Sequence, residues 1–238
     1  MTTWNLRAIR TFALLSPAIL PPAPSLCADC VTWEEIRSSP DARSQHAMAY
    51  DSRRGVVVLF GGSGLHGLVF PETWEWDGDR WTLVASTGPG WRIEHAMSFD
   101  SRRGVTVLFG GYSADGVTDG TWEWDGAHWM FRNTAGPTHL SDLQLTYDER
   151  RGITILFGRV ADTYSYETWG YDGESWTPLR SDSLSGMWHA HGMAFDARRG
   201  VIVLLAAVGD SNQTWEWDGA AWSLRNDGGV PLTGYFEL

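Results

Sequence analysis

The chain has 238 residues, of which 43% are hydrophobic and 20% charged, so it is long enough for one sizeable globular domain. Its formal net charge of -11 excludes the broad basic surface that binding to a phosphate backbone requires, and nucleic acid is not an expected partner. No run of 18 apolar residues occurs, so no transmembrane segment is expected in the mature chain. The 15 Trp and 27 Gly are high for this length and indicate a repeated unit.

Residues 1–28 have the order of charged, apolar and small side chains that a secretory signal has. Arg7 and Arg10 precede the apolar residues 12–20, and small side chains follow. We expect cleavage after Ala28, export, and an extracytoplasmic location, either periplasmic or secreted. Four prolines interrupt the apolar stretch: Pro17, Pro21, Pro22 and Pro24.

The first repeated unit, over about residues 43–84, predicts four antiparallel strands. Residues 46–50 alternate between larger and smaller side chains, which predicts a first strand with two different faces. The uninterrupted apolar run 56–60 predicts a second strand that is buried on both faces. The Trp-Glu-Trp run at 74–76 predicts a third strand, and the Asp-Gly that follows it predicts a tight hairpin into a fourth strand.

The same pattern returns three more times along the chain. The aspartates that close each first strand are spaced by 49, 48 and 48 residues: Asp51, Asp100, Asp148 and Asp196. A period near 50 with a second, Trp-containing string after each apolar run is typical of propeller blades. We therefore expect an all-β fold, a β-propeller of four complete four-stranded antiparallel blades, over about residues 43–84, 92–132, 139–179 and 188–225.

Four hydrophobic residues followed by Gly61-Gly62, and then by Trp76 and Trp81, resemble the Kelch motif. The chain is thus similar to the Kelch-repeat β-propeller family, of the bacterial type that resembles the central domain of galactose oxidase, over about residues 43–225. The third unit departs from the motif with Arg159, and the fourth with Ala206-Ala207 in place of Gly-Gly.

The two ends of the repeat array predict an incomplete fifth blade in a domain over residues 29–238. Trp33 precedes His46 much as Trp81 precedes its own following histidine, so residues 32–36 are expected to form an orphan last strand. Residues 234–238 fall where a further first strand would begin. Kelch-like propellers usually have six or seven blades, so three arrangements stay open: a tight four-blade ring, an open arc, or a ring completed by a second molecule. An open arc would expose apolar blade edges and favour self-association.

Recurring polar residues are interpreted mainly as parts of the fold. His46, His95 and His191 share one repeat position and suggest a metal site, but the third unit has Leu143 there and no carboxylate stands at metal-ligand spacing, so no metal is expected. Each unit also carries an Arg-Arg pair in its first turn, and we interpret these arginines as solvated turn residues beside the anchor aspartates.

No cofactor is expected either. Cys27 and Cys30 form a single C-x-x-C with no second pair, which predicts neither a zinc nor a redox site. The resemblance implies the copper centre of galactose oxidase, but that centre needs a cysteine crosslinked to a tyrosine, and the repeats contain none. A nucleophile elbow, a P-loop and a dinucleotide fingerprint are also missing from the sequence.

The long connections of the blades gather on one rim of the predicted propeller, and they vary where the blades repeat. Function normally concentrates on such loops over a rigid scaffold. Aromatic and charged side chains in or beside them are our candidate ligand-binding residues: Trp91, Arg92, Glu94, Tyr112, Asp115, Tyr164 and Trp188.

The sequence therefore favours an exported, non-enzymatic interaction module that binds a glycan or a protein through this rim. One alternative is a small carbohydrate-active isomerase or hydrolase that uses carboxylates near the central channel. A second alternative is a truncated fragment of a larger propeller without an independent function. No catalytic residue is assigned.

Overall fold

The computed structural model describes residues 39–132, 136–163, 165–182, 184, 186–209 and 211–231, which belong to one compact unit. The predicted signal segment 1–28 and the predicted orphan strands 32–36 and 234–238 lie outside these residues. Within the described part of the chain, no helix is long and apolar enough to cross a membrane.

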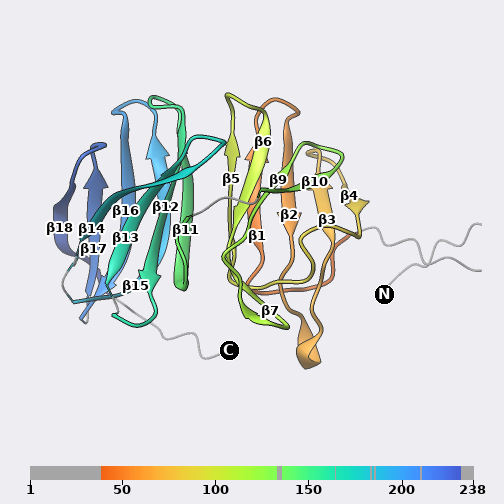
Figure 1. The fold of residues 1–238 in the computed structure, drawn as a ribbon, viewed down its shortest axis with the longest axis horizontal. Helices are drawn as coiled ribbons and strands as arrows, with labels where there is room; N and C mark the ends of the chain where they lie inside the picture. The colour runs from red at the N-terminus through yellow and green to blue at the C-terminus, as the bar shows by residue number, and fades with distance from the viewer. Residues whose placement is uncertain are drawn as a thin grey trace, which may run out of the picture. The chain divides into compact units, whose positions relative to one another are not determined.

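The described strands form four four-stranded antiparallel sheets, which confirms the predicted blades (Figure 1). Blade one consists of β1 (Ala47–Asp51), β2 (Val56–Phe60), β3 (Thr73–Trp76) and β4 (Trp81–Ala85). Blade two consists of β5 (Ala96–Asp100), β6 (Val105–Phe109), β9 (Thr121–Trp124) and β10 (Trp129–Arg132). Blade three consists of β11 (Leu140–Asp148), β12 (Ile153–Val160), β13 (Tyr166–Tyr171) and β14 (Trp176–Asp182), and blade four of β15 (Met187–Asp196), β16 (Val201–Val208), β17 (Ser211–Trp217) and β18 (Trp222–Pro231).

Two of the long connections contain small elements of secondary structure. A short 3-10 helix, η1 (Leu65–Gly67), lies between β2 and β3. A two-stranded sheet of β7 (Tyr112–Ser113) and β8 (Gly116–Val117) lies between β6 and β9. The second of these is a fifth, partial sheet, and it belongs to the long connection of blade two.

The turn between the first two strands of each blade is built by its anchor aspartate. Asp51 Oδ1 accepts hydrogen bonds from the backbone N–H groups of Arg53 and Arg54 over 3.0 and 3.1 Å. Gly55 then takes a φ of 71°, a left-handed conformation that glycine adopts without a steric penalty. The recurring D-x-R-R-G string therefore encodes this hairpin locally, before any contact between blades is made.

The loss of the second glycine lengthens the strands of blades three and four. Gly61 and Gly62 have φ of 69° and 95°, so they turn the chain out of the sheet where β2 ends. Arg159 and Ala207 replace this second glycine, and the chain stays extended to Val160 in β12 and to Val208 in β16. Blade four consequently runs from Met187 to Pro231, a longer range than residues 188–225.

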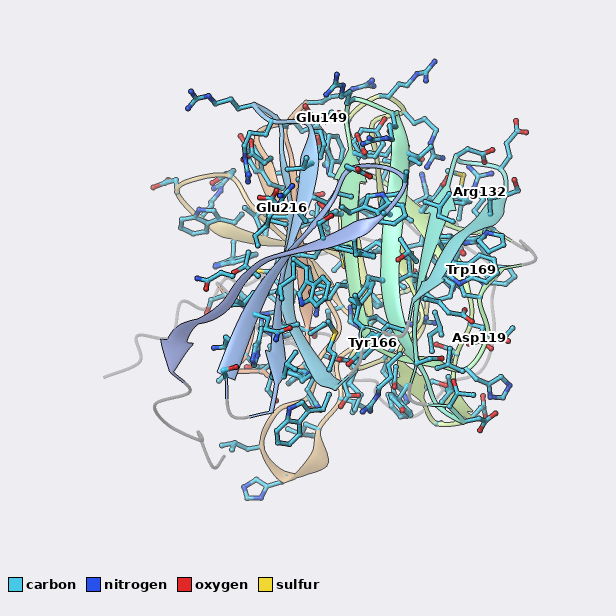
Figure 2. The ribbon with its side chains drawn as sticks, turned by 90° about the vertical axis from the view of Figure 1, so that its left-hand side faces the viewer. Asp119, Arg132, Glu149, Tyr166, Trp169 and Glu216 are labelled. Carbon is cyan, nitrogen blue, oxygen red and sulfur yellow. The ribbon has the colours of Figure 1, made fainter. Side chains whose placement is uncertain are left out.

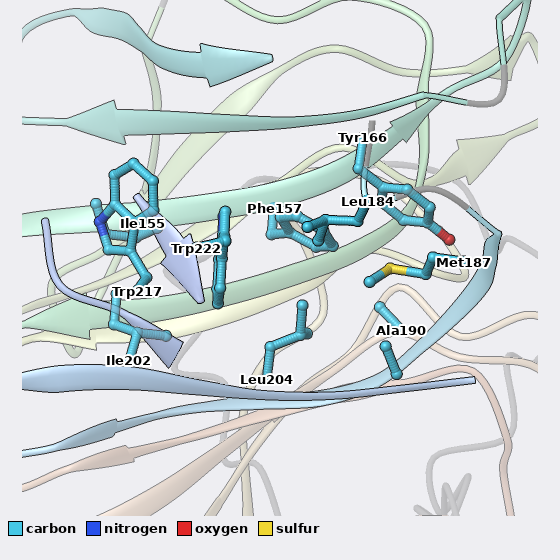
Figure 3. Close-up of a cluster of buried hydrophobic side chains, with 11 residues drawn as sticks. Ile155, Phe157, Tyr166, Leu184, Met187, Ala190, Ile202, Leu204, Trp217 and Trp222 are labelled. Carbon is cyan, nitrogen blue, oxygen red and sulfur yellow. The ribbon is translucent and has the colours of Figure 1, made fainter. Parts of the chain in front are cut away.

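The hydrophobic core is divided among the seams between successive blades. The first strands lie next to one another, β1 beside β5, β5 beside β11, and β11 beside β15. In the third seam, Phe157 of blade three packs edge-on against Trp222 of blade four, within a buried cluster that also contains Ile155, Leu204 and Trp217 (Figure 3). The aromatic side chains that recur in the sequence thus join neighbouring blades.

The arginine pairs take part in these seams, which revises their interpretation as solvated turn residues. Arg54 Nε donates to Asp51 Oδ2 over 2.6 Å, and its two terminal nitrogens donate to the Glu75 carboxylate over 2.9 and 2.7 Å. Arg53 donates to the Arg102 carbonyl in the next blade over 2.5 Å. Arg54 therefore pairs with carboxylates of its own blade, and both arginines lie over turn glycines of the next blade, Gly104 and Gly126.

Candidate functional site

A cavity of about 430 Å³ opens on the rim that carries the long connections. This rim, where Tyr166 begins β13, lies opposite the end of the blades at which Glu149 marks the short turns (Figure 2). Strands and connections of all four blades contribute to the cavity wall, which consists of Gln45, Glu94, His95, Tyr112, Ser141, Asp142, Leu143, Arg159 and His189. We call it the rim cavity.

Three of its residues occupy the same repeat position, immediately before His46, His95 and Leu143, the first residue of the repeated string in each unit. Gln45, Glu94 and Asp142 have φ of 56°, 56° and 53°, in the left-handed region that side chains other than glycine rarely adopt. Such backbone strain costs on the order of 1–3 kcal/mol per residue and is found most often at binding and catalytic sites. The repeat thus directs three different polar side chains toward one cavity.

Backbone and side-chain hydrogen bonds hold two of these residues together. The Glu94 N–H donates to the Gln45 carbonyl over 3.0 Å. The Gln45 amide nitrogen in turn donates to Glu94 Oε1 over 2.7 Å. Glu94 itself is exposed, and its Oε2 accepts no hydrogen bond among the described residues, so this oxygen is available to a ligand.

Asp142 is the centre of a second, largely buried network. Its Oδ1 lies 2.7 Å from His189 Nδ1, and its Oδ2 accepts hydrogen bonds of 2.8 Å from the Tyr166 hydroxyl and the Ala190 N–H. Burial opposes ionisation of Asp142, but the hydrogen bonds from His189, Ala190 and Tyr166 outweigh burial and hold its pKa below the usual value.

The partners of Asp142 are shifted in the complementary direction. The hydrogen bond to Asp142 raises the pKa of His189 above 6.5, so the imidazole carries a proton more readily than a free histidine does. Burial, followed by the hydrogen bond to Asp142 and the charge of that carboxylate, raises the pKa of Tyr166 and keeps its hydroxyl protonated. The half of the cavity beside blade four therefore presents the His189 imidazole, which is held on the Asp142 carboxylate.

His95 forms part of the cavity floor and is neutral. It is 5% exposed, and burial lowers the pKa of its imidazole to about 3. Neither ring nitrogen has a hydrogen-bond partner among the described residues, and the ring packs edge-on against Phe60. Within the same residues, no three His, Cys, Asp or Glu side chains converge as metal ligands would.

The structure separates the candidate residues predicted from sequence. Glu94 and Tyr112 line the rim cavity, and exposed Trp188 stands beside it, with its carbonyl 3.5 Å from Arg159 Nη1. Asp115 is exposed in the turn between β7 and β8, and Trp91 is half-buried away from the cavity lining. Tyr164 lies outside the described residues.

Arg92 does not lie on the ligand-accessible rim, where the sequence analysis expected it. It is buried, and its guanidinium donates to the Gly110 carbonyl over 3.0 Å and to the Pro89 carbonyl over 2.6 Å. Burial lowers the pKa of this guanidinium to about 10. Arg43 of blade one likewise donates to the Gly61 carbonyl, over 3.1 Å, so this arginine recurs as a clamp between connections.

The sequence reasoning missed Gln45, Asp142, Arg159 and His189. A signal was present, because Gln45, Glu94 and Asp142 differ at one position of a nearly identical repeat, and Arg159 stands where the other units have glycine or alanine. His189 precedes the repeat string and is set apart only by its contact with Asp142.

The sequence matches no family model and no curated protein. Solved structures are similar in fold. YjhT is 14% identical, with 84% of this chain and 69% of that chain aligned at a TM-score of 0.60. A chain of the nidogen/laminin complex is 16% identical over 77% of this chain and 65% of that chain, with a TM-score of 0.55. A protein of unknown function from Dyadobacter fermentans is 12% identical over 79% of this chain and 70% of that chain, with a TM-score of 0.51. At these identities the likeness shows the fold alone, and the chain is a β-propeller.

Proposed function

We propose that this protein is a non-enzymatic binding module that takes a short glycan in the rim cavity. The observation that carries the proposal is the convergence of Gln45, Glu94 and Asp142, each in a strained left-handed conformation, on one cavity. A purely structural repeat has no need for three different polar side chains at a strained position. A ligand that contacts several blades at once accounts for all three.

The chemistry of the cavity favours a neutral ligand that is rich in hydroxyl groups. Two carboxylates, Glu94 and Asp142, are balanced by Arg159 and by His189 when it is protonated. Hydroxyl groups of a sugar both donate and accept, so they suit a wall in which acceptors and donors alternate. The volume of about 430 Å³ falls within the range of about 300–1,000 Å³ that small-molecule sites occupy.

Two further features of the proposal concern family and location. The Gly-Gly steps and spaced tryptophans support the assignment of the blades to the Kelch type. The order of basic, apolar and small residues in 1–28 supports export, which would bring the cavity into contact with extracellular or periplasmic glycans.

A glycan array identifies the ligand, and calorimetry with that ligand tests the site. Glu94→Gln and Asp142→Asn are each expected to weaken binding at least about tenfold, or about 1.4 kcal/mol, because the first removes a charged acceptor and the second removes the carboxylate that orients His189. Glu174→Gln makes the same charge change on the exposed turn between β13 and β14 and is expected to bind like the wild type. Equal affinity in all three variants would refute the rim cavity as the binding site.

A second candidate function rests on the pair formed by Asp142 and His189. A carboxylate that orients an imidazole and raises its pKa, on the same cavity as Glu94, is an arrangement suited to acid–base catalysis. This pair favours an isomerase or hydrolase acting on the bound glycan. NMR of that glycan during incubation distinguishes the candidates: turnover that His189→Gln abolishes would identify an enzyme, whereas an unchanged glycan indicates binding alone.

A further inference from the structure

The three seams between consecutive blades are assembled from the same parts. Each blade presents its arginine pair on one face, here called the donor face, and two turn glycines on the other, here called the acceptor face. A Cβ on Gly152 would lie 3.0 Å from Arg102 Nη1, and one on Gly173 would lie 2.7 Å from Arg103 Nε. The same contacts recur in the other two seams, over Gly104 and Gly126 of blade two and over Gly200 and Gly219 of blade four.

The acceptor face of blade one and the donor face of blade four lack these contacts. Gly55 and Gly78, the equivalent glycines of blade one, have no atom of the described residues within 4 Å of an added Cβ. Arg198 and Arg199, the equivalent arginines of blade four, lie against none of the described turn glycines, and Arg199 pairs with Asp196 and Glu216 of its own blade. The two halves of a fourth seam are therefore both present in the chain and are not joined to each other.

The apolar side chains on these two faces are exposed, whereas their counterparts in the three seams are buried. Met48 and Tyr50 on blade one are 52% and 59% exposed, whereas Met97 and Phe99 at the same positions of blade two are 7% and 9% exposed. On blade four, Leu205 is 37% exposed. Its counterparts in the other blades are at most 1% exposed: Phe60, Phe109 and Phe157. Apolar surface of this kind marks an interface.

The donor and the acceptor of the hydrogen bond that joins each seam are also present on the two exposed faces. Trp129 donates to Thr73 of the preceding blade over 2.8 Å, and the equivalent pair of the fourth seam is Trp81 with Thr214. No hydrogen bond involves the Trp81 indole or the Thr214 hydroxyl within the described part of the chain. Blade one thus carries the hydrogen-bond donor of a fourth seam, and blade four carries its acceptor.

We infer that the donor face of blade four binds the acceptor face of blade one in a second copy of this chain. The partner is a second copy because a second copy carries the complementary residues at the same repeat positions that form the three seams. Its turn glycines match the arginines of blade four, its Trp81 matches Thr214, and its Tyr50 matches Leu205. The interface is heterologous, so it either closes a ring of two chains or extends into a longer assembly. The inference does not depend on the rim cavity.

Light scattering on the full-length protein over a range of concentrations tests the interface. The wild type is expected to reach a mass of at least two chains. Tyr50→Arg and Leu205→Arg are each expected to remain single chains, because either one places a charge in the seam. Leu68→Arg alters an exposed leucine outside both faces and is expected to assemble like the wild type.

Mixing the two blocked variants separates this interface from any other. Tyr50→Arg keeps an intact blade four, and Leu205→Arg keeps an intact blade one, so an equimolar mixture is expected to form a heterodimer although neither variant pairs alone. Both side chains are exposed in the single chain, and thermal unfolding at low concentration is expected to confirm that both variants stay folded. The inference would be overturned by a wild type that remains a single chain at every concentration, which is the result expected if its own terminal residues cover the two faces. It would also be overturned by assembly that persists in both variants, or by a mixture that stays monomeric.

Discussion

The indole N–H of Trp129, at the start of the last strand of blade two, donates to Thr73 Oγ1 in the third strand of blade one over 2.8 Å. Trp176 and Trp222 repeat this bond to Thr121 and Thr168, each over 2.9 Å. The threonines are buried, so the bonds are shielded from water. The recurring tryptophan of the last strand therefore ties each blade to its predecessor.

Trp129→Phe is expected to lower the free energy of unfolding by about 1–3 kcal/mol, because the buried Thr73 hydroxyl loses its donor. Trp122→Phe is the matched control, since Trp122 is also half-buried and its indole makes no hydrogen bond among the described residues. Urea unfolding of both variants measures the difference. An equal loss in the two variants would show that ring volume, and not the hydrogen bond, accounts for the effect.

Gly170→Glu is expected to stabilise the protein by about 1 kcal/mol, because it supplies an acceptor for a buried donor that lacks one. Trp217 Nε1 is buried and has no hydrogen-bond partner among the described residues, whereas the equivalent Trp124 donates to Glu75 of its preceding blade over 3.0 Å. Blade three has glycine where blade one has that glutamate.

Gly170→Ala is the control for this substitution. An added Cβ meets only the flexible ends of Ile153 and Leu179, each at 3.3 Å, and brings no carboxylate. Thermal unfolding compares the two variants. A glutamate variant that is no more stable than the alanine variant would contradict the assignment of the missing acceptor.

His95→Leu is expected to reduce the loss of stability in acid. The pKa of His95 is about 3 in the folded protein and near 6.5 in the unfolded chain, so only the unfolded chain takes up this proton as the pH falls below 6.5. The loss amounts to up to about 1.4 kcal/mol per pH unit, or about 2 kcal/mol at pH 5. Leucine already stands at this repeat position in blade three, as Leu143.

Denaturant unfolding at pH 7 and pH 5 checks this prediction. The wild type is expected to lose more stability between the two values than His95→Leu does. His128→Leu, which alters an exposed histidine in the turn between β9 and β10, is expected to keep the wild-type dependence. An identical acid loss in all three proteins would show that His95 is not buried as a neutral group.

Asp142→Asn is expected to lower the pKa of His189, which NMR titration of the imidazole measures directly. The raised pKa of His189 makes its contribution to stability complete below pH 6.5, and this contribution is lost as the pH rises through the folded pKa. The lowered pKa of Asp142 makes its contribution present above about 3.9, and this contribution is lost as the pH falls through the folded pKa. The pair is therefore strongest between these limits. Asp115→Asn alters an exposed turn carboxylate and is expected to leave the His189 titration unchanged; a shift there, or none in Asp142→Asn, would contradict the pairing.

The candidate site was only half predictable from the sequence. Glu94 and Tyr112 stand out as polar and aromatic residues beside variable connections, and both line the rim cavity. Asp142 and His189 are 47 residues apart, and nothing in their local strings indicates that their side chains meet over 2.7 Å. Arg92 stands beside the same connections in the sequence, but its side chain is buried and donates to backbone carbonyls.

The sequence by itself determined the blades. Each hairpin is specified by residues within a few positions of one another, as Asp51 and Gly55 show, and alternation and period place the strands without reference to the rest of the chain. The tertiary structure alone decided which recurring side chains join blades, which strained residues surround the cavity, and which two faces remain exposed. These depend on contacts between residues about one repeat apart, and the repeat that makes every blade alike also hides which of its faces has a neighbour.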